Sequence, residues 1–202
     1  MRALLKASGA IDAVNDVFGV IANWLVLLAC LLSAGNAFVR YGLNTMLSLH
    51  QMFPLLPGLE GFVGAYGRNA NSFLEGQWYM FAGMVLFGAA YTFKVNEHVR
   101  VDLVYGMVSE RTRILIDIFG IVLFLLPMCL ILIYFTWPWF LESFRGNEAS
   151  SNAGGLIRWP VKLVLPVGFM LMALQGFSEL IKRIAALQHH FALQYQYEKP
   201  LQ

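Results

Sequence analysis

Two long apolar segments joined by a polar stretch constrain the fold more than any other feature of this sequence. Residues 77–95 and 114–136 are predominantly apolar. The loop at 96–102 contains four ionisable residues: Glu97, His98, Arg100 and Asp102. An α-helix needs about 20 apolar residues to cross about 30 Å of hydrocarbon. Each segment is close to that length, so the pattern predicts a transmembrane hairpin with a charged turn.

The composition places the chain among integral membrane proteins. Of its 202 residues, 58% are hydrophobic and 13% are charged, and the mean hydropathy is +0.62. Soluble domains contain about 25% charged residues, so about half of the usual surface charge is missing. The formal net charge of +2 is small, and the basic residues form no run. We therefore expect no nucleic-acid partner.

Four apolar segments predict an all-α integral membrane protein with four transmembrane helices. They lie at residues 17–39, 77–95, 114–136 and 161–184. Residues 1–16 have a weak amphipathic pattern, which predicts a short N-terminal helix on the membrane surface. We expect residues 1–202 to form a single membrane domain that ends in a polar cytoplasmic tail at 185–202.

The segment 42–76 does not fit the pattern of the four helices. It contains Pro54 and Pro57 and then a glycine at every third position from 58 to 67. One interpretation is a re-entrant or helix-packing segment in which backbones approach closely, and the other is a flexible loop. Under either interpretation, the segment is expected to be an insertion on the outer side of the membrane.

Three local signals predict how individual helices begin, bend and pair. Ser109 is a candidate N-cap for the third transmembrane helix. Pro127 should kink that helix unless neighbouring groups satisfy the carbonyl that it leaves free. Glu179 lies three and four residues before Lys182 and Arg183, so these side chains can form ion pairs on one face of the fourth helix.

The distribution of Lys and Arg predicts the orientation in the membrane. With both termini on one side, that side holds nine of these residues and the opposite side holds five. Lys and Arg are enriched on the cytoplasmic side of membrane proteins. The count therefore predicts that both termini are cytoplasmic.

The sequence offers no arrangement typical of a catalytic, cofactor-binding or metal-binding site. The four histidines lie outside the central parts of the apolar segments, so a haem held between two helices is not expected. They are His50, His98, His189 and His190. Cys30 and Cys129 each lie in the middle of a separate apolar segment, where a thiol usually serves packing.

A few polar residues interrupt the apolar segments: Asn23, Ser33, Asn36 and Gln175. Such side chains form hydrogen bonds between transmembrane helices or line a transport pathway. None of the predicted helices has a charge near its centre, so we expect the first role. A subunit that supports a larger partner fits this pattern better than a transporter complete in itself.

The loop 96–102 has two interpretations. It is a solvated cytoplasmic turn, or it is a fixed polar structure in which Arg100 pairs with Glu97 or Asp102 and His98 bonds a helix end. A basic loop of this kind also attracts anionic phospholipid headgroups.

The chain resembles the small membrane subunit, the DctQ-type protein, of tripartite ATP-independent periplasmic (TRAP) transporters. The resemblance spans nearly the full chain, although the segment at about 48–70 departs from the common pattern. Five stretches carry it: residues 36–41, 77–79, 96–102, 151–160 and 166–180.

The resemblance implies a non-catalytic subunit of a Na⁺-coupled importer in the bacterial inner membrane. In such a transporter, a periplasmic binding protein delivers an organic acid or related solute. A large DctM-type membrane subunit carries the substrate and sodium sites, and no cofactor is involved. The small subunit would then be a scaffold for the large one and part of the docking face for the binding protein.

The resemblance also suggests roles for individual residues. Asn36 and Arg40 would join the outer end of the first helix to the scaffold or the docking face. The residues of the polar loop would fix the hairpin against the large subunit or phospholipid: Glu97, His98, Arg100 and Asp102. Arg158 and Trp159 would lie where the binding protein docks. The alternative function is a self-sufficient homo-oligomeric transporter or the membrane anchor of an enzyme complex.

Overall fold

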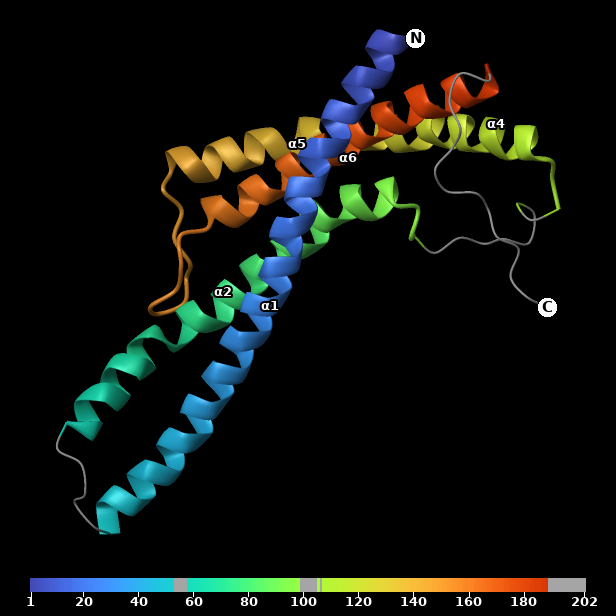
Figure 1. The fold of residues 1–202 in the computed structure, drawn as a ribbon. Coiled ribbons are helices and arrows are strands. Elements are labelled where there is room, and N and C mark those ends of the chain that lie inside the picture. Colours follow the sequence, from blue (N-terminus) through green and yellow to red (C-terminus); the bar gives the residue numbers. More distant parts are fainter. Residues whose placement is uncertain (53–57, 99–104, 106, 189–202) are drawn as a thin grey trace.

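The computed structural model describes residues 1–52, 58–98, 105 and 107–188, and these residues are predominantly helical. The β-structure among them is limited to one isolated bridge between Ala149 and Ile157. Figure 1 shows two long helices, α1 and α2, lying side by side and crossing a second group formed by α4, α5 and α6. The expected all-α class is confirmed.

Helix α1 is one continuous element, Arg2–Met52. The expected short helix at 1–16 is therefore not a separate element, and the helix does not stop at Arg40. No proline occurs before residue 54 to remove a helical hydrogen bond, and the first part of α1 packs against α6. At 1.5 Å per residue, α1 is about 75 Å long, more than twice the thickness of the hydrocarbon core.

Helix α2, Leu59–Lys94, runs antiparallel to α1. It begins directly after Gly58, whose φ of 88° suits a residue without a Cβ atom. Most of the segment 42–76 is thus helical: its residues 42–52 extend α1, and 59–76 extend α2. The Tyr66 hydroxyl donates a hydrogen bond to the Asn36 side chain across the pair. The described parts of the segment match the helix-packing interpretation.

Small residues let α1 and α2 approach closely. A Cβ atom at Gly88 would lie 3.6 Å from the Cβ atom of Ala22, an ordinary contact distance. At Gly83, a Cβ atom would lie 2.7 Å from the Leu25 side chain, which is too short for real contacts. At Gly83, therefore, a larger residue could enter only if the Leu25 side chain moved, whereas Gly88 and Ala22 pack at an ordinary distance.

Helices α4 (Glu110–Gly120) and α5 (Leu126–Arg145) form one rod, joined by the π-helical turn η1 (Ile121–Leu125). The Ser109 side chain accepts a hydrogen bond from the backbone N–H of Thr112, so the predicted cap is confirmed. The π turn ends at Leu125, two residues before Pro127. In this turn, the Leu126 N–H donates to the carbonyl of Ile121, five residues earlier, as in a π-helix. The turn thereby accommodates Pro127, which has no N–H to donate.

Helix α6, Trp159–Leu187, lies at the centre of the fold and packs against α1, α2, α4 and α5. Its Ala173 lies in the main apolar core with Ile121, Leu126 and Cys129. A Cβ atom at Gly168 would lie 2.6 Å from the Leu86 side chain. The small residues of α6 therefore allow neighbouring helices to approach it from several sides.

Within the described residues, three helical stretches are long and apolar enough to cross a membrane: Arg2–Leu49, Glu110–Arg145 and Trp159–Leu187. They include three of the four predicted crossings. Helix α2 does not qualify, since its apolar part is bounded by Gln77, Trp78 and Tyr79 at one end and by Lys94 at the other. A membrane protein follows from these helices, whereas a fourth crossing stays a prediction.

Candidate functional site

A buried polar network, here called the inner cluster, joins the first part of α1 to the last part of α6. Its members are Ser8, Asp12 and Asn15 from α1, Asp117 from α4, and Gln175, Ser178, Glu179, Lys182 and Arg183 from α6. The α1 members are spaced by four and three residues, which places them on one face of that helix. The start of α1 and the end of α6 therefore lie at the same end of the molecule (Figure 1).

Hydrogen bonds between amides and hydroxyls form the core of the inner cluster. The Asn15 Nδ2 donates to Gln175 Oε1 at 2.7 Å, and both side chains are fully buried. The Gln175 Nε2 donates in turn to Asp12 at 3.1 Å and to Glu179 at 3.2 Å. The Ser178 hydroxyl donates to Asp12 at 2.7 Å. These bonds satisfy groups that would be costly to bury alone, although the Asn15 Oδ1 atom is buried without a hydrogen-bond partner among the described residues.

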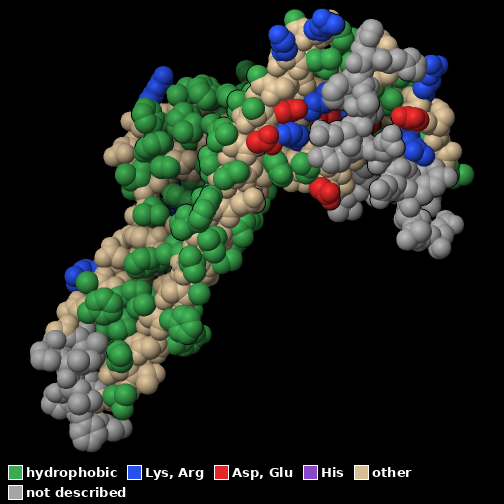
Figure 2. Space-filling model, viewed as in Figure 1, with side chains coloured by type: hydrophobic (Ala, Val, Ile, Leu, Met, Phe, Trp, Pro, Cys, Tyr) green, Lys and Arg blue, Asp and Glu red, His purple; other side chains and the backbone are tan. Residues whose placement is uncertain are grey.

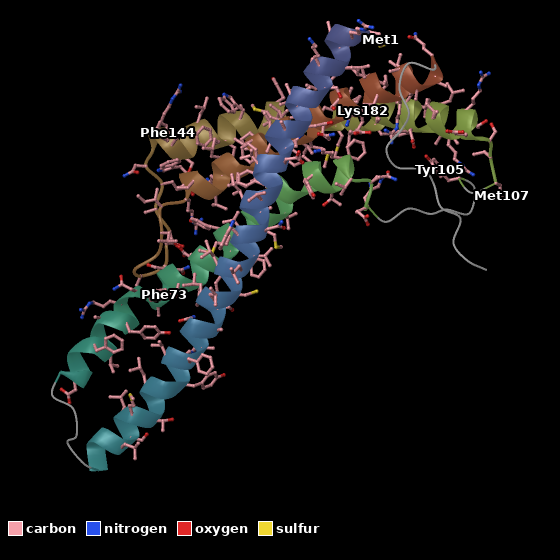
Figure 3. The ribbon with its side chains drawn as sticks, in the orientation of Figure 1. Met1, Phe73, Tyr105, Met107, Phe144 and Lys182 are labelled. Carbon is pink, nitrogen blue, oxygen red and sulfur yellow. The ribbon has the colours of Figure 1, made fainter. Side chains whose placement is uncertain are left out.

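Ion pairs surround these hydrogen bonds. Lys182 lies 2.7 Å from Asp12 and 2.8 Å from Glu179. Arg183 pairs with Glu179 and, through Nε at 3.0 Å, with Asp117. The predicted local pairs of Glu179 with the two cations are confirmed. Figure 3 labels Lys182 on the part of α6 next to α1, and Figure 2 shows the charged side chains gathered at this end of the molecule.

A further ion pair fixes α2 to α1. The Lys94 ammonium contacts the Asp16 carboxylate, one turn beyond Asp12 on α1. Together with the inner cluster, this pair links the cytoplasm-facing ends expected for α1, α2, α4 and α6. In this arrangement, oppositely charged groups on different helices face one another.

At the opposite end, the loop between α5 and α6 closes over α2 through Glu75. The Oε2 atom of Glu75 accepts from the Leu156 N–H at 2.7 Å, and Oε1 accepts from Ser150 and from Asn152, the latter at 2.9 Å. We call Glu75 with these three partners the outer clamp. The hydrogen bonds from Ser150, Leu156 and Asn152 to its carboxylate lower the pKa of Glu75 below the ordinary value.

Further contacts hold the same loop on α2. Asn71 donates to the Ala153 carbonyl at 2.9 Å, and Ser72 donates to the Gly154 carbonyl. Gly154 has a φ of 68°, and a Cβ atom there would lie 1.9 Å from the Arg68 carbonyl oxygen. Only glycine fits so close to the α2 backbone. In Figure 3, Phe144 and Phe73 mark the α5 and α2 sides of this loop.

Glu148 forms a second charged group on the outer loop. It pairs with Lys162, and its carboxylate lies 3.8 Å from the Arg158 guanidinium. The hydrogen bond from Lys162 lowers the pKa of Glu148, and the positive charge of Arg158 acts in the same direction. Lys162 also lies 4.3 Å from the centre of the Trp139 ring. Trp139 and Trp159 are aromatic residues of the kind found at membrane interfaces.

The site residues predicted from the sequence do not form one site. Asn36 and exposed Arg40 lie on the extended part of the α1–α2 pair, whereas Arg158 and Trp159 lie by the outer loop. At the other end, Glu97 is exposed and the His98 ring lies 5.5 Å from that of Phe93. Arg100 and Asp102 lie outside the described residues, so the structure does not test the fixed polar loop.

Sequence reasoning missed Glu75, Asp12 and Asn15. A signal existed for Glu75, because an acid placed directly before the apolar part of α2 needs partners if it is buried. For the inner cluster, the signal was the polar pattern of 8, 12 and 15 in α1 together with 175, 178 and 179 in α6. Neither pattern identifies its partner from sequence alone.

The described residues contain no group of three or more His, Cys, Asp or Glu side chains placed to hold a metal ion. Cys129 is buried and Cys30 is exposed, and both thiols are free. The polar groups at the two ends pair with one another and with neighbouring backbone. Their arrangement is suited to holding the helices together.

We expect replacement of Glu75 by glutamine to loosen the outer loop at neutral pH. The hydrogen bond from the Leu156 N–H to a charged acceptor contributes about 1.5–3 kcal/mol, and glutamine removes the charge. Hydrogen exchange at the Leu156 amide, corrected for its intrinsic rate, should rise about tenfold or more in Glu75→Gln at pH 7.

The same contact predicts a pH dependence in the wild-type protein. Because the pKa of Glu75 is lowered in the folded loop, its stabilisation is present above the ordinary glutamate pKa of about 4.3. That stabilisation is lost as the pH falls through the lower, folded value. Protection of Leu156 should drop below about pH 4 in the wild type but change little in Glu75→Gln. Equal pH profiles for the two proteins would contradict this role.

The comparisons with known proteins identify one family. Residues 75–186 match the family model described as tripartite ATP-independent periplasmic transporters, DctQ component. The match begins at Glu75 and excludes residues 1–74, so the resemblance at 36–41 lies outside it. No curated protein and no solved structure matches the chain. The matched residues include Glu75 and its three partners in the outer clamp. Since they make up more than half of the chain, this protein belongs to the DctQ family of small membrane subunits of TRAP transporters.

Proposed function

We propose that this chain is the static scaffold subunit of a Na⁺-coupled TRAP importer for an organic acid or related solute in the bacterial inner membrane. The observation that carries the proposal is the inner cluster. Its carboxylates and cations pair with each other across three helices, at distances of 2.7–3.0 Å for the pairs Asp12–Lys182 and Asp117–Arg183. Breaking a buried pair costs about 3–5 kcal/mol, which favours a bracket that does not rearrange during transport.

The proposal includes four crossings with both termini in the cytoplasm. The inner cluster joins the start of α1 to the end of α6, which supports the same side for these two ends. The Lys and Arg count of nine against five supports the cytoplasm as that side. Helix α2 then crosses next to α1, where Lys94 meets Asp16.

The partners we propose are a large DctM-type membrane subunit, a periplasmic binding protein and membrane phospholipid. Native mass spectrometry of the tagged chain, extracted gently from its own membranes, tests the proposal. A stoichiometric complex with one much larger membrane polypeptide supports the scaffold function. A homo-oligomer that transports solute by itself in liposomes would overturn it.

The docking face for the binding protein is proposed to include the outer loop and the extension of the α1–α2 pair. Leu32 lies against Gly76, two residues before Trp78. If Trp78 marks the outer interface, α1 continues for about 20 residues beyond it, which is about 30 Å. We call residues 33–52 and 59–76 the arm. Figure 1 shows it extending away from α5 and α6.

Arg40 on the arm and Arg158 by the outer loop are the cations that we assign to docking. Replacing both with alanine should weaken binding of the periplasmic protein by about three- to tenfold, mainly through slower association, because charges at the rim of an interface steer encounter. Surface plasmon resonance with the complex in nanodiscs measures this. Arg111→Ala, at the exposed start of α4 on the opposite side, is the control. Unchanged association after the double substitution would remove these residues from the docking face.

A further inference from the structure

A broad groove separates α2 from the α4–α5 rod. Its volume is about 1150 Å³, and α6 contributes part of its lining through Gly168, Phe169 and Met172. Much of its surface is apolar and uncovered: Val85 is 60%, Phe124 64% and Met128 56% exposed. We call this space the membrane groove, because its walls belong to the segments expected to cross the bilayer.

Asn23 is a polar residue on the wall of the membrane groove that α1 provides. Its side chain is exposed and has no hydrogen-bond partner within the described part of the chain. Asn15, two turns earlier on the same helix, donates a hydrogen bond to Gln175. The fold thus provides a partner for one asparagine of α1 and leaves the other facing a largely apolar groove, whose polar lining residues include Thr92, Asp117 and Arg183.

The position of Asn23 makes a missing partner costly. It lies seven residues beyond Asp16, which is paired with Lys94 at the inner end, and nine residues before Leu32, which lies near the outer end. At 1.5 Å per residue, Asn23 is about 10 Å from the inner pair. It is therefore close to the middle of the hydrocarbon, where water does not supply hydrogen bonds.

The chemistry of the groove discriminates between two kinds of occupant. Apolar walls alone do not distinguish a lipid from a protein helix, because lipid tails cover apolar side chains as well as a protein helix does. An acyl chain, however, has no group that can bond the Asn23 amide. A transmembrane helix with a polar side chain does, and the small residues along the groove let such a helix approach closely. They include Ala89 and Gly120, and a Cβ atom at Gly120 would contact nothing within 4 Å.

We propose that a transmembrane helix of the large membrane subunit lies in the membrane groove and brings a hydrogen-bonding side chain to Asn23. This inference rests on the proposed scaffold function and adds the location of the interface. The neighbouring face of α1, with exposed Trp24 and Leu28, carries only apolar side chains and does not line the groove. That face contacts lipid.

Site-specific photo-crosslinking in native membranes tests the location. A benzophenone amino acid replaces Phe124 on the groove wall or, as the matched control, Leu28 on the lipid face. We expect a product between position 124 and a transmembrane peptide of the large subunit, with lipid adducts alone at position 28. Products at position 124 with lipid alone, or with a second copy of this chain, would overturn the inference.

The outcome is read together with native mass spectrometry of the unmodified complex. If no large subunit co-purifies, the scaffold function itself fails. If it co-purifies but position 124 does not crosslink to it, only the location of the interface is wrong. The two failures are therefore distinguishable.

Substitution of Asn23 tests the hydrogen bond separately. Asn23→Leu should weaken retention of the large subunit by about fivefold, the effect typical of one interhelical hydrogen bond in a membrane, without unfolding this chain. Asn23→Gln, which keeps the amide, should retain most of the affinity. Equal retention by the leucine variant and the wild type would show that Asn23 makes no bond to the partner.

Discussion

Replacing Arg183 with alanine is expected to lower the free energy of unfolding by about 3–5 kcal/mol. Arg183 is 8% exposed and pairs with both Asp117 and Glu179. Its removal leaves two carboxylates in a region of low dielectric without their common partner. The free-energy cost of those carboxylates is expected to exceed the cost of the packing contacts that are lost with the Arg183 side chain. Thermal unfolding of the purified protein in one fixed detergent measures the change.

Arg111→Ala is the matched control for Arg183→Ala. Arg111 is exposed at the start of α4 and forms no ion pair within the described residues, so its loss should change stability by less than about 0.5 kcal/mol. Arg183→Lys keeps the charge but cannot bond two carboxylates through a planar fork, so an intermediate loss is expected. An Arg183→Ala variant as stable as the wild type would show that the inner cluster is not a structural bracket.

Replacing Gly154 with alanine should displace the outer loop from α2, at a cost of about 2–5 kcal/mol. Two terms contribute: a left-handed backbone costs a residue with a Cβ atom about 1–2 kcal/mol, and overpacking costs about 1–3 kcal/mol. The added Cβ atom would otherwise lie 1.9 Å from the Arg68 carbonyl oxygen. The loop must therefore move away, and the hydrogen bond from Asn71 to Ala153 must break.

Limited proteolysis and hydrogen exchange of the outer loop measure the effect of Gly154→Ala. Gly67→Ala in α2 is the control, because that glycine is helical, exposed and has open space around it. Alanine there should be neutral or slightly stabilising. If the loop is equally protected from proteolysis and hydrogen exchange in both variants, close contact between Gly154 and α2 does not hold the loop in place.

The sequence predicted features that depend on neighbours within one or two helical turns. The cap at Ser109 and the pairs of Glu179 with Lys182 and Arg183 need only a helix and the right spacing, and both are present. The class of protein followed from the length of the apolar segments and the low charge. The family followed from stretches of which four, beginning at residue 77, lie within the matched region 75–186.

The boundaries of α1 could not be predicted in the same way. Residues 1–16 by themselves suggested a surface helix, since Asp12, Asn15 and Asp16 are polar. Their partners are more than 75 residues away: Gln175 and Lys182 on α6 and Lys94 on α2. Because of these contacts, the polar residues pack against α2 and α6 within the protein. This explains why α1 continues without a break from its amino end into the apolar segment.

The sequence by itself determined that this protein is an all-helical membrane protein of the DctQ family, because apolar length, charge content and local motifs are properties of contiguous residues. Only the tertiary structure decided which polar residues meet a hydrogen-bonding partner. Glu75 binds a loop about 75 residues away, and Asn15 finds Gln175, whereas Asn23 on the same helix is left facing a groove. That difference depends on how the helices cross, since the packing geometry determines which side chains of distant segments meet.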